Sequence, residues 1–369
     1  MSKNMNSEKE LVSIIILNYN GNEFLENCIE SIFRETEQKF ELIIVDNNSP
    51  DKSGKKLSKK YESCKFILNQ KNVGVSEGLN IGIRNANGSH IILLNNDLIV
   101  APKWLDYLFE AYKEKGNALY QPKFLKMKNR NIIDSAGNLI NVFGFGFSRQ
   151  KGRKDNLQYN TIEEIGFAAG TCLFCSKKIF DEIGLFDEKL FAYNEDLDFG
   201  WRARLSNYKS YYVPKSIVYH HGSAQWKWSG EKFYLLERNR WIVLLSNYSI
   251  KTILKLLPSL LIIEILLLLF FAKKKMLIKK LRSYGGIIKF INHIKQKRKK
   301  IEKIRKKDDH EILKSFSSII ETPLEVSESE SVDKFNKLLR ILSKVNGFDN
   351  ILKEGQQHLK VDKESSHKC

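Results

Sequence analysis

The sequence predicts an α/β fold in which a mainly parallel sheet is flanked by helices and followed by a helical, basic C-terminal extension. Three observations support this class. Short apolar runs alternate with segments of helical periodicity, polar clusters follow three of those runs, and a long apolar stretch leads into a block of Lys and Arg. Such alternation is typical of parallel strands joined by right-handed helical crossovers.

Four strands and four helices are expected in roughly the first hundred residues. The strand candidates are short, rich in β-branched residues and almost continuously apolar, which indicates burial on both faces. They are residues 12–17, 41–45, 65–68 and 91–94. The helices follow them: an apolar face from Phe24 to Phe33, a stretch opening at Pro50, one from Ser76 to Ala86, and one with Pro102 in its first turn.

The rest of the chain is expected to form a second block and then a helical extension. Residues 117–165 have an irregular pattern, and a strand is expected over 166–176, followed by a helix from Lys177 and a turn at Gly184. A further strand is expected over 209–221. Beyond the polar linker 326–333, the apolar spacing from Phe335 to Leu342 predicts a small amphipathic helix.

These segments give four predicted regions. Residues 1–10 are expected to be disordered, and because they lack an apolar core we expect no signal peptide. Residues 11–245 form the α/β domain, 246–310 an apolar and then polybasic helical region, and 311–369 a linker with a small helical tail. The sequence indicates no particular oligomeric state.

Cysteine usage suits a reducing compartment. The five cysteines are an odd, scattered set: Cys28, Cys64, Cys172, Cys175 and Cys369. Cys172 and Cys175 form one CxxC inside an apolar run, with no second pair and no nearby His. We therefore expect both to be core residues and not zinc ligands.

The net charge of +18 is concentrated in one segment. Residues 273–307 hold sixteen Lys or Arg and a single acid, Glu302, so this segment accounts for +15 of the total. A nearly neutral remainder disfavours a nucleic-acid-binding protein, and a basic block directly after an apolar segment favours an anionic membrane surface. A nicotinamide dehydrogenase is also disfavoured, because no GxGxxG follows the first strand.

Polar clusters follow three of the expected strands. They are Asn18-Tyr19-Asn20, Asp46-Asn47-Asn48 and Asn95-Asn96-Asp97. Any one of them could be a turn, but the carboxyl ends of parallel strands share one sheet edge, where ligands bind. A carboxylate such as Asp97 can hold Mg²⁺ or Mn²⁺ together with water and substrate phosphates.

A second set of candidates lies in "YNEDLDFGWR". Asn194 can cap a helix whose first turn holds Glu195, Asp196 and Asp198. These acids can simply complement the helix dipole, with Asp198 and Arg202 forming a surface ion pair. Alternatively, one acid in a partly apolar cleft can act as a general base. Further along, His220 and His221 are adjacent on a strand, so at most one would face a metal.

In these residues the sequence resembles the family 2 glycosyltransferases, in particular rhamnosyltransferase-like members, over about residues 11–245. The resemblance is carried by ordered motifs: "VSIIILNYNG", "LIIVDNNSPD", "NVGVSEGLNIGI", "ILLNNDLIV", "AGTCLFCSKKIFDEIGLFDE", "YNEDLDFGWR", "VYHHGSA" and "ERNRW". It implies a GT-A fold, a nucleotide-sugar donor and transfer with inversion at the anomeric carbon.

The resemblance also implies roles for individual residues. Asp196 matches the catalytic base, with Glu195 and Asp198 beside it. Asp97 matches the ligand of a divalent cation (Mg or Mn), with His220, or less closely His221, as an additional contact. The residues implied in nucleotide-sugar binding are Asn18, Tyr19, Asn20, Asp46, Asn47, Asn72, Gly74, Gly78, Asn80, Asn95, Asn96, Arg202 and Arg238. The sequence departs from the family in beginning its metal motif with Asn95 in place of Asp.

The expected partners follow from this resemblance. They are a nucleotide-sugar donor and a glycan or lipid-linked acceptor, at the cytoplasmic face of the membrane; nucleic acid is not expected. Residues 252–272 are long enough to span a bilayer, but a single crossing would put the catalytic domain and the basic block on opposite sides. An interfacial or re-entrant helix or a buried core helix are the alternatives, with the membrane surface contacted through 252–307. A catalytically silent, donor-binding scaffold is the competing function.

Overall fold

The computed structural model describes residues 10–156, 159–222, 229–322, 330–348 and 350–352, so the expected disordered N-terminus falls almost wholly outside the described residues. The helices are α1 (Leu25–Glu35), α2 (Ser53–Ser58), α3 (Gly74–Arg84), α4 (Trp104–Lys115), α5 (Lys177–Ile183), η1 (Glu188–Leu190), α6 (Glu195–Leu205), α7 (Gly230–Asn247), α8 (Ile250–Lys273), α9 (Leu277–Lys289), α10 (Ile291–Ile304), α11 (Asp309–Leu313) and α13 (Glu330–Val345). The strands are β1 (Val12–Asn18), β2 (Phe40–Asp46), β3 (Lys65–Leu68), β4 (His90–Asn95), β5 (Leu98–Val100), β6 (Leu119–Lys126), β7 (Asn129–Ser135), β8 (Asn138–Ile140), β9 (Gly146–Ser148), β10 (Glu163–Ile165), β11 (Cys172–Ser176) and β12 (Ser210–His220).

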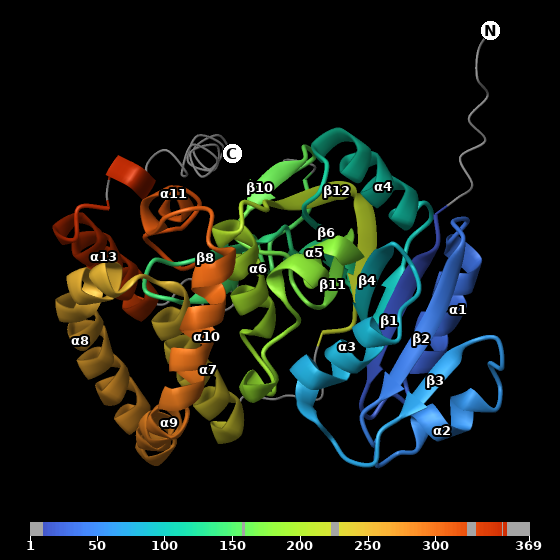
Figure 1. The fold of residues 1–369 in the computed structure, drawn as a ribbon, viewed down its shortest axis with the longest axis horizontal. Coiled ribbons are helices and arrows are strands. Elements are labelled where there is room, and N and C mark those ends of the chain that lie inside the picture. The colour runs from blue at the N-terminus through green and yellow to red at the C-terminus, as the bar shows by residue number, and fades with distance from the viewer. Residues whose placement is uncertain (1–9, 157–158, 223–228, 323–329, 349, 353–369) are drawn as a thin grey trace, which may run out of the picture.

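The four expected apolar runs are the parallel half of one large sheet. Its order is β10-β12-β6-β11-β4-β1-β2-β3, with β5 paired to β12 and β7 to β6 (Figure 1). In the parallel register, Ile15 of β1 lies opposite Ile43 of β2 and Leu93 of β4. Helices α1 and α4 pack on one face of the sheet and α3, α5 and α6 on the other. Burial on both faces explains why β1, β2 and β4 are continuously apolar, whereas β3 at the edge of the sheet is largely exposed.

The expectation that residues 117–165 are irregular is wrong, because five strands lie there. β6 is an inner strand that runs antiparallel to β11 and parallel to β12, so this half of the sheet is mixed. Polar residues inside β6 hide its pattern, and two of them have partners elsewhere in the fold. Gln121 donates to Ser135 at 3.0 Å, and Lys123 pairs with Asp155 at 2.9 Å.

The expected strand over 166–176 is shorter in the structure, where only β11 is extended. Residues 168–171 form a loop at the end of the sheet. Cys172 and Cys175 are fully buried and unbonded, in core clusters on opposite faces of the sheet, which confirms them as core residues. Cys369 lies outside the described residues.

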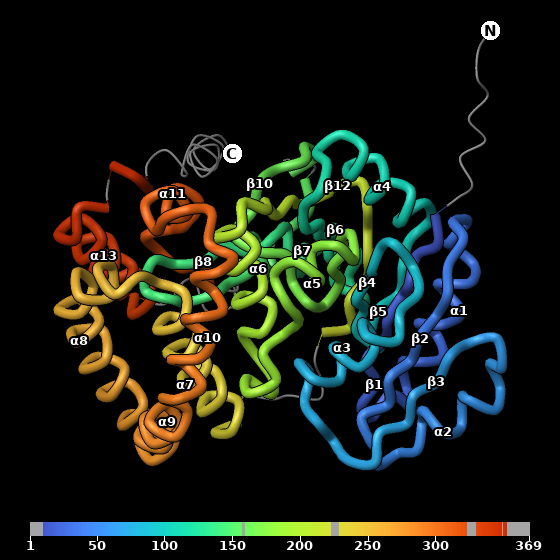
Figure 2. The backbone as a smooth tube through the Cα atoms, in the orientation of Figure 1, coloured from blue at the N-terminus to red at the C-terminus, as the bar shows by residue number. Residues whose placement is uncertain are grey.

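Helices α7 to α10 and α13 form a separate layer beside the sheet (Figures 1 and 2). One apolar cluster joins this layer to α6, since Trp201 and Leu205 pack with residues of α7, α8, α10 and α13. The layer begins with α7, at Gly230, inside the range assigned to the α/β domain. The amphipathic helix expected near residues 335–342 is confirmed as α13.

Helix α8 contains the apolar stretch 252–272. Among the described residues it is the one helix that is long and apolar enough to cross a membrane, and 28% of its most apolar 18 residues are buried inside the protein. Its acid, Glu264, points into the helical layer. Glu264 pairs with Arg240 of α7 and with Lys280 of α9, the latter at 2.7 Å, and accepts a hydrogen bond from Tyr284 at 2.5 Å. Burial raises the pKa of Glu264, but Arg240 and Lys280 outweigh it and leave the pKa below its ordinary value.

We expect Glu264→Leu to destabilise the protein by about 3 kcal/mol, because removing one member of a buried ionic cluster leaves charge without its partner. Chemical denaturation would measure this. Glu302→Leu is the control, since Glu302 is exposed on α10, and we expect it to change the free energy of unfolding by less than about 0.5 kcal/mol. A stability unchanged or raised by Glu264→Leu would mean that Glu264 does not hold the layer together.

Candidate active site

The three polar clusters meet at the carboxyl edge of the parallel strands, as expected. Asn18 Nδ2 donates to Asp46 Oδ1 at 2.6 Å, and Asn96 Nδ2 donates to Asn18 Oδ1 at 2.7 Å. The Asn20 backbone N–H donates to Ser49 Oγ at 3.2 Å, and Tyr19 beside it is half-buried. This network fixes the ends of β1, β2 and β4 against one another. The contacts of these residues with a nucleotide stay a prediction.

Asn47 joins this edge to the start of α3. Its side-chain nitrogen donates to Asn72 Oδ1 at 3.0 Å and to Gly74 O at 2.9 Å. Gly74 has φ +87, and a Cβ there would lie 2.5 Å from Phe191 O; a Cβ on Gly78 would lie 2.4 Å from Leu17 Cδ1. Both glycines therefore permit close packing within the chain. The resemblance implies that both glycines bind the donor, but this geometry accounts for them without a ligand.

Asn80 has a structural role in this geometry. Its side chain donates to Phe186 O at 3.0 Å and accepts from Phe186 N at 3.0 Å. It therefore holds the segment that leads from α5 toward α6. These two hydrogen bonds account for the presence of Asn80 without any contact to a nucleotide. A role of Asn80 in donor binding stays a prediction that the geometry does not support.

Asp97, in the turn after β4, faces His220 at the end of β12. His220 Nε2 lies 3.4 Å from Asp97 Oδ2, and His220 Nδ1 lies 2.7 Å from Asp134 Oδ2. Burial lowers the pKa of His220, but the two carboxylates outweigh it and raise the pKa to about 9. His221 differs: its ring packs on Phe24 at 4.5 Å, and only its backbone N–H reaches Asp97, at the carbonyl oxygen.

Asp97 and His220 fit a divalent cation that is completed by substrate. Mg²⁺ and Mn²⁺ are commonly held by one or two protein ligands, with phosphate oxygens and water filling the remaining positions. Within the described ranges no group of three or more His, Cys, Asp or Glu side chains is arranged to hold a metal ion by itself, so a cation here would depend on the donor's diphosphate. Asp134, which contacts Nδ1 of His220, would fix the orientation of the His220 imidazole.

The loop 168–171 connects this pair to Asp196. Thr171 O accepts from Asn95 N at 3.0 Å, and the adjacent Gly170 N donates to Asp196 Oδ2 at 3.0 Å. Burial raises the pKa of Asp196 above its ordinary value, although the N–H groups of Gly170 and Leu197 oppose this. Burial, and then the charge of Asp196, raise the pKa of Glu195 to about 8. Asp196 thus has the raised basicity that a general base needs.

The loop that leads into α6 is strained. Phe191, Tyr193 and Asn194 have φ values of 66, 69 and 64, and each such residue costs on the order of 1–3 kcal/mol. Asn239 of α7 stabilises the loop, since its Nδ2 donates to Leu190 O, Ala192 O and Tyr193 O at 2.7–2.9 Å. The Asn194 side chain donates to Leu236 O instead of capping α6, contrary to expectation.

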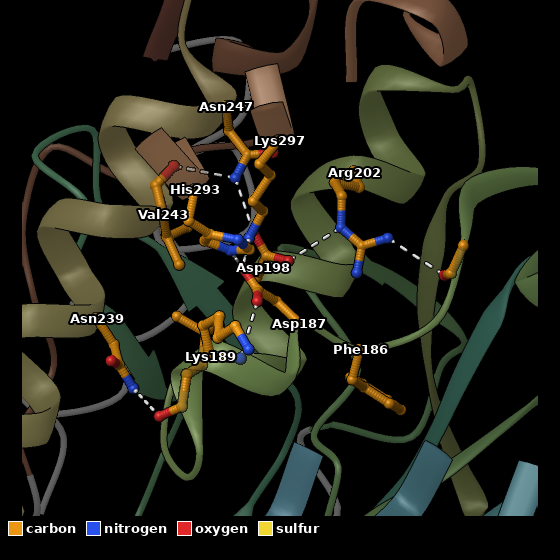
Figure 3. Close-up of polar contacts among 12 residues, drawn as sticks. Phe186, Asp187, Lys189, Asp198, Arg202, Asn239, Val243, Asn247, His293 and Lys297 are labelled. Carbon is orange, nitrogen blue, oxygen red and sulfur yellow. Dashed lines mark hydrogen bonds and ion pairs between the residues drawn. The ribbon is translucent and has the colours of Figure 1, made fainter. Parts of the chain in front are cut away.

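Asp198 and Arg202 are buried, so the expectation of a surface ion pair is wrong. Arg202 Nε lies 2.9 Å from Asp198 Oδ2 (Figure 3). Its other nitrogens donate to the carbonyls of Ile183, Gly184 and Leu185. Asp198 is completely buried and has structural partners, so it is not placed as a catalytic acid. With its donors engaged in this way, Arg202 is not supported as a pyrophosphate ligand.

Arg238 is held in the same way. Its Nη2 donates to Lys189 O at 3.1 Å and Leu190 O at 2.8 Å, and its guanidinium lies 5.4 Å from the Phe290 ring centroid. These contacts anchor the loop in front of α6. The predicted contact of Arg238 with pyrophosphate or acceptor is likewise unsupported by this geometry.

Three important residues escaped the sequence analysis. Asp134 lies on a strand that was expected to be irregular, and Asn239 lies inside the quoted motif "ERNRW", where only Arg238 was singled out. Lys297 was treated as part of a surface charge block but is buried against Asp187 and Asp198. Of these three residues, only Asn239 lies in a motif that the sequence analysis quotes, so "ERNRW" was the one available signal.

Comparison with solved structures gives the class of fold. A structure of GalNAc-T7 with UDP, GalNAc and Mn²⁺ matches 67% of this chain and 49% of that chain, with a TM-score of 0.55 and 19% identity. The fold is therefore of the GT-A glycosyltransferase type, as expected.

Sequence comparison then shows which family part of the chain resembles. Residues 13–184 match the model of glycosyl transferase family 2. The low-salt glycan biosynthesis hexosyltransferase Agl10 of Haloferax volcanii is 27% identical over 53% of this chain and 62% of its own length. The N-acetylglucosaminyl-diphospho-decaprenol L-rhamnosyltransferase of Mycobacterium tuberculosis is 22% identical over 58% of this chain and 76% of its own.

Proposed function

We propose that this protein is an inverting glycosyltransferase that moves a sugar from a nucleotide-sugar donor to a hydroxyl group of a glycan or lipid-linked acceptor. One observation carries the proposal. Asp196, a partly buried carboxylate of raised pKa, is joined through Gly170 and Thr171 to the end of β4, after which Asp97 faces His220 of β12. A base and a diphosphate-facing group at neighbouring positions are what a single displacement requires.

The reaction would proceed in one step. Asp196 accepts the proton of the acceptor hydroxyl while that oxygen forms a bond to the anomeric carbon. The bond between the anomeric carbon and the diphosphate oxygen breaks on the opposite face, and the nucleoside diphosphate leaves with the electron pair. When Mg²⁺ or Mn²⁺ is bound at Asp97 and His220, it supplies neutralisation of the leaving diphosphate.

The acceptor class is proposed from the relatives. The mycobacterial relative is named for a polyprenyl diphosphate acceptor and the archaeal one for glycan biosynthesis, so we propose a hexosyl donor, with rhamnose as one option, and a lipid-linked or glycan acceptor. Incubation with labelled nucleotide sugars and a bacterial or archaeal lipid extract would test this. Label in the lipid fraction supports transfer, whereas donor binding with no transfer to any acceptor would favour the silent scaffold.

We further propose that the protein attaches to the cytoplasmic face of a membrane through α8 and α9. Exposed apolar side chains of α8 recur at helical spacing along one face: Leu254, Leu257, Leu261, Ile265 and Leu269. The stripe leads to the exposed Lys273, Lys274 and Lys275 and to Ile278, which is 81% exposed. An apolar stripe next to exposed lysines suits a helix lying in an anionic membrane surface. The inward position of Glu264 also favours this arrangement over a crossing helix.

Leu261→Ser combined with Ile265→Ser is expected to weaken binding to anionic liposomes by about tenfold or more, because a buried Leu or Ile contributes about 1.5–3 kcal/mol. Flotation of liposomes in a density gradient would measure the bound fraction. The matched control is Phe33→Ser with Leu68→Ser, since these are exposed apolar residues of α1 and β3 and not of α8. Equal loss in both variants, or none in the first, would contradict attachment through α8.

A further inference from the structure

One buried lysine of the basic block 273–307 contacts two acids that lie on either side of Asp196 in the chain. Lys297 of α10 is only 7% exposed, and its ammonium lies 2.7 Å from Asp187 Oδ2 and 2.7 Å from Asp198 Oδ1 (Figure 3). His293, one turn earlier, has Nε2 2.9 Å from the same Asp187 oxygen. A buried cation held by two carboxylates is part of the fold, so Lys297 is not available to a membrane surface.

Asp187 and Asp198 bracket the segment that carries Asp196. Asp187 caps η1 by accepting from Lys189 N at 3.0 Å, and the strained loop follows directly. Asp198 lies in the first turn of α6 and also accepts from Asn247 Nδ2 at 3.0 Å. Lys297 therefore links Asp187 at the start of this segment to Asp198 at its end.

The strained loop requires contacts that hold its backbone in place. Non-glycine residues with positive φ persist only where the surrounding structure holds them. Asn239 holds the carbonyls in the middle of the loop, and Lys297 holds the acids at its two ends. The exposed basic residues of α10 make no comparable contact, and Lys299 is one of them.

We propose that Lys297 is a positioning residue that holds Asp196 in place for the reaction by clamping Asp187 and Asp198 together. The inference rests on the proposed sugar transfer, in which Asp196 is the base. It divides the basic block by function: Lys273, Lys274 and Lys275 lie beside the apolar stripe proposed to face the membrane, and Lys297 links the helical layer to the catalytic helix. The ends of β1, β2 and β4 are held by hydrogen bonds among Asn18, Asp46 and Asn96, which do not include the clamp.

The test compares Lys297→Met with Lys299→Met, which removes the same charge from the same helix. We expect Lys297→Met to lower kcat by roughly 10- to 100-fold through misplacement of the base, with the KM for the donor changed by less than about twofold. Lys299→Met should leave both constants unchanged, and Lys297→Arg should restore part of kcat. Equal kcat in the two Met variants, or a loss confined to the donor KM, would overturn the proposal.

Hydrogen exchange tests the clamp independently of activity. In Lys297→Met the amides of residues 191–198 should exchange at least about tenfold faster, while those of β1 and β2 stay unchanged. If Lys297→Met does not fold, Asp187→Asn replaces it, because this variant keeps the oxygen that accepts from Lys189 N. Unchanged exchange at residues 191–198 would overturn the clamp. If the wild-type protein transfers no sugar, the proposed function fails, and the exchange experiment still decides whether Lys297 holds the loop.

Discussion

Asp196→Asn is expected to lower kcat by about 10²–10⁴-fold, the range that a positioned general base contributes. Asparagine keeps the size of the side chain and can still accept from Gly170 N, so the donor dissociation constant should stay the same. Rates of nucleoside diphosphate release with acceptor present, together with calorimetric titration of the donor, would measure both quantities.

The control for this variant is Asp181→Asn, an exposed acid on the nearby helix α5, which should behave as the wild-type protein. Loss of donor binding together with kcat in Asp196→Asn would mean that Asp196 belongs to the donor pocket. An unchanged kcat would mean that another group accepts the proton.

The raised pKa of Asp196 leads to a prediction for the pH dependence of the reaction. The base must be deprotonated to act, and burial raises the pKa of Asp196, so activity should be present at high pH and lost as the pH falls through that raised value. The acid limb of kcat/KM should therefore lie above the range of an ordinary aspartic acid. A limb at the ordinary aspartate position would contradict the buried environment of Asp196.

Asp97→Ala is the second variant for which a large effect is expected. Removing a group that faces the departing diphosphate should lower kcat on the order of 100-fold or more. A second readout does not depend on turnover: calorimetric titration of Mn²⁺ in the presence of a nucleoside diphosphate should show binding to the wild-type protein and none to Asp97→Ala.

Asp181→Ala again serves as the control for Asp97→Ala, since it removes one exposed carboxylate far from the sheet edge. If Mn²⁺ binds Asp97→Ala as tightly as the wild-type protein, Asp97 is not a cation ligand. His220 would then be held by Asp97 and Asp134 for structural reasons alone.

Three strands of the parallel half of the fold, β1, β2 and β4, were predictable because they are buried on both faces. Ile14 and Ile15 of β1 point to opposite core clusters, which leaves an unbroken apolar run in the sequence. β6 was not predictable in the same way. Gln121 and Lys123 interrupt its pattern, and their partners Ser135 and Asp155 are identified only by the fold.

Much of the candidate site could be proposed from ordered motifs, whereas its supporting residues could not. Asp97 and Asp196 stand in short motifs at the ends of predicted elements. Asp134 is 86 residues from His220 in the chain, and Lys297 is 110 residues from Asp187. No local periodicity connects such pairs. The sequence also gave no indication that Arg202 and Asp198 are buried, because an i, i+4 pair looks the same on a surface and in a core.

The central claim is that the carboxyl edge of β1, β2 and β4 binds a nucleotide sugar for transfer. The most direct test is nucleoside diphosphate release from a panel of nucleotide sugars, with Mn²⁺ or Mg²⁺ or with a chelator, measured beside thermal unfolding. We predict that one donor class raises the unfolding temperature in the presence of metal and is turned over faster when a lipid-linked acceptor is added. If no nucleotide sugar stabilises the protein or is consumed under any of these conditions, the claim is contradicted.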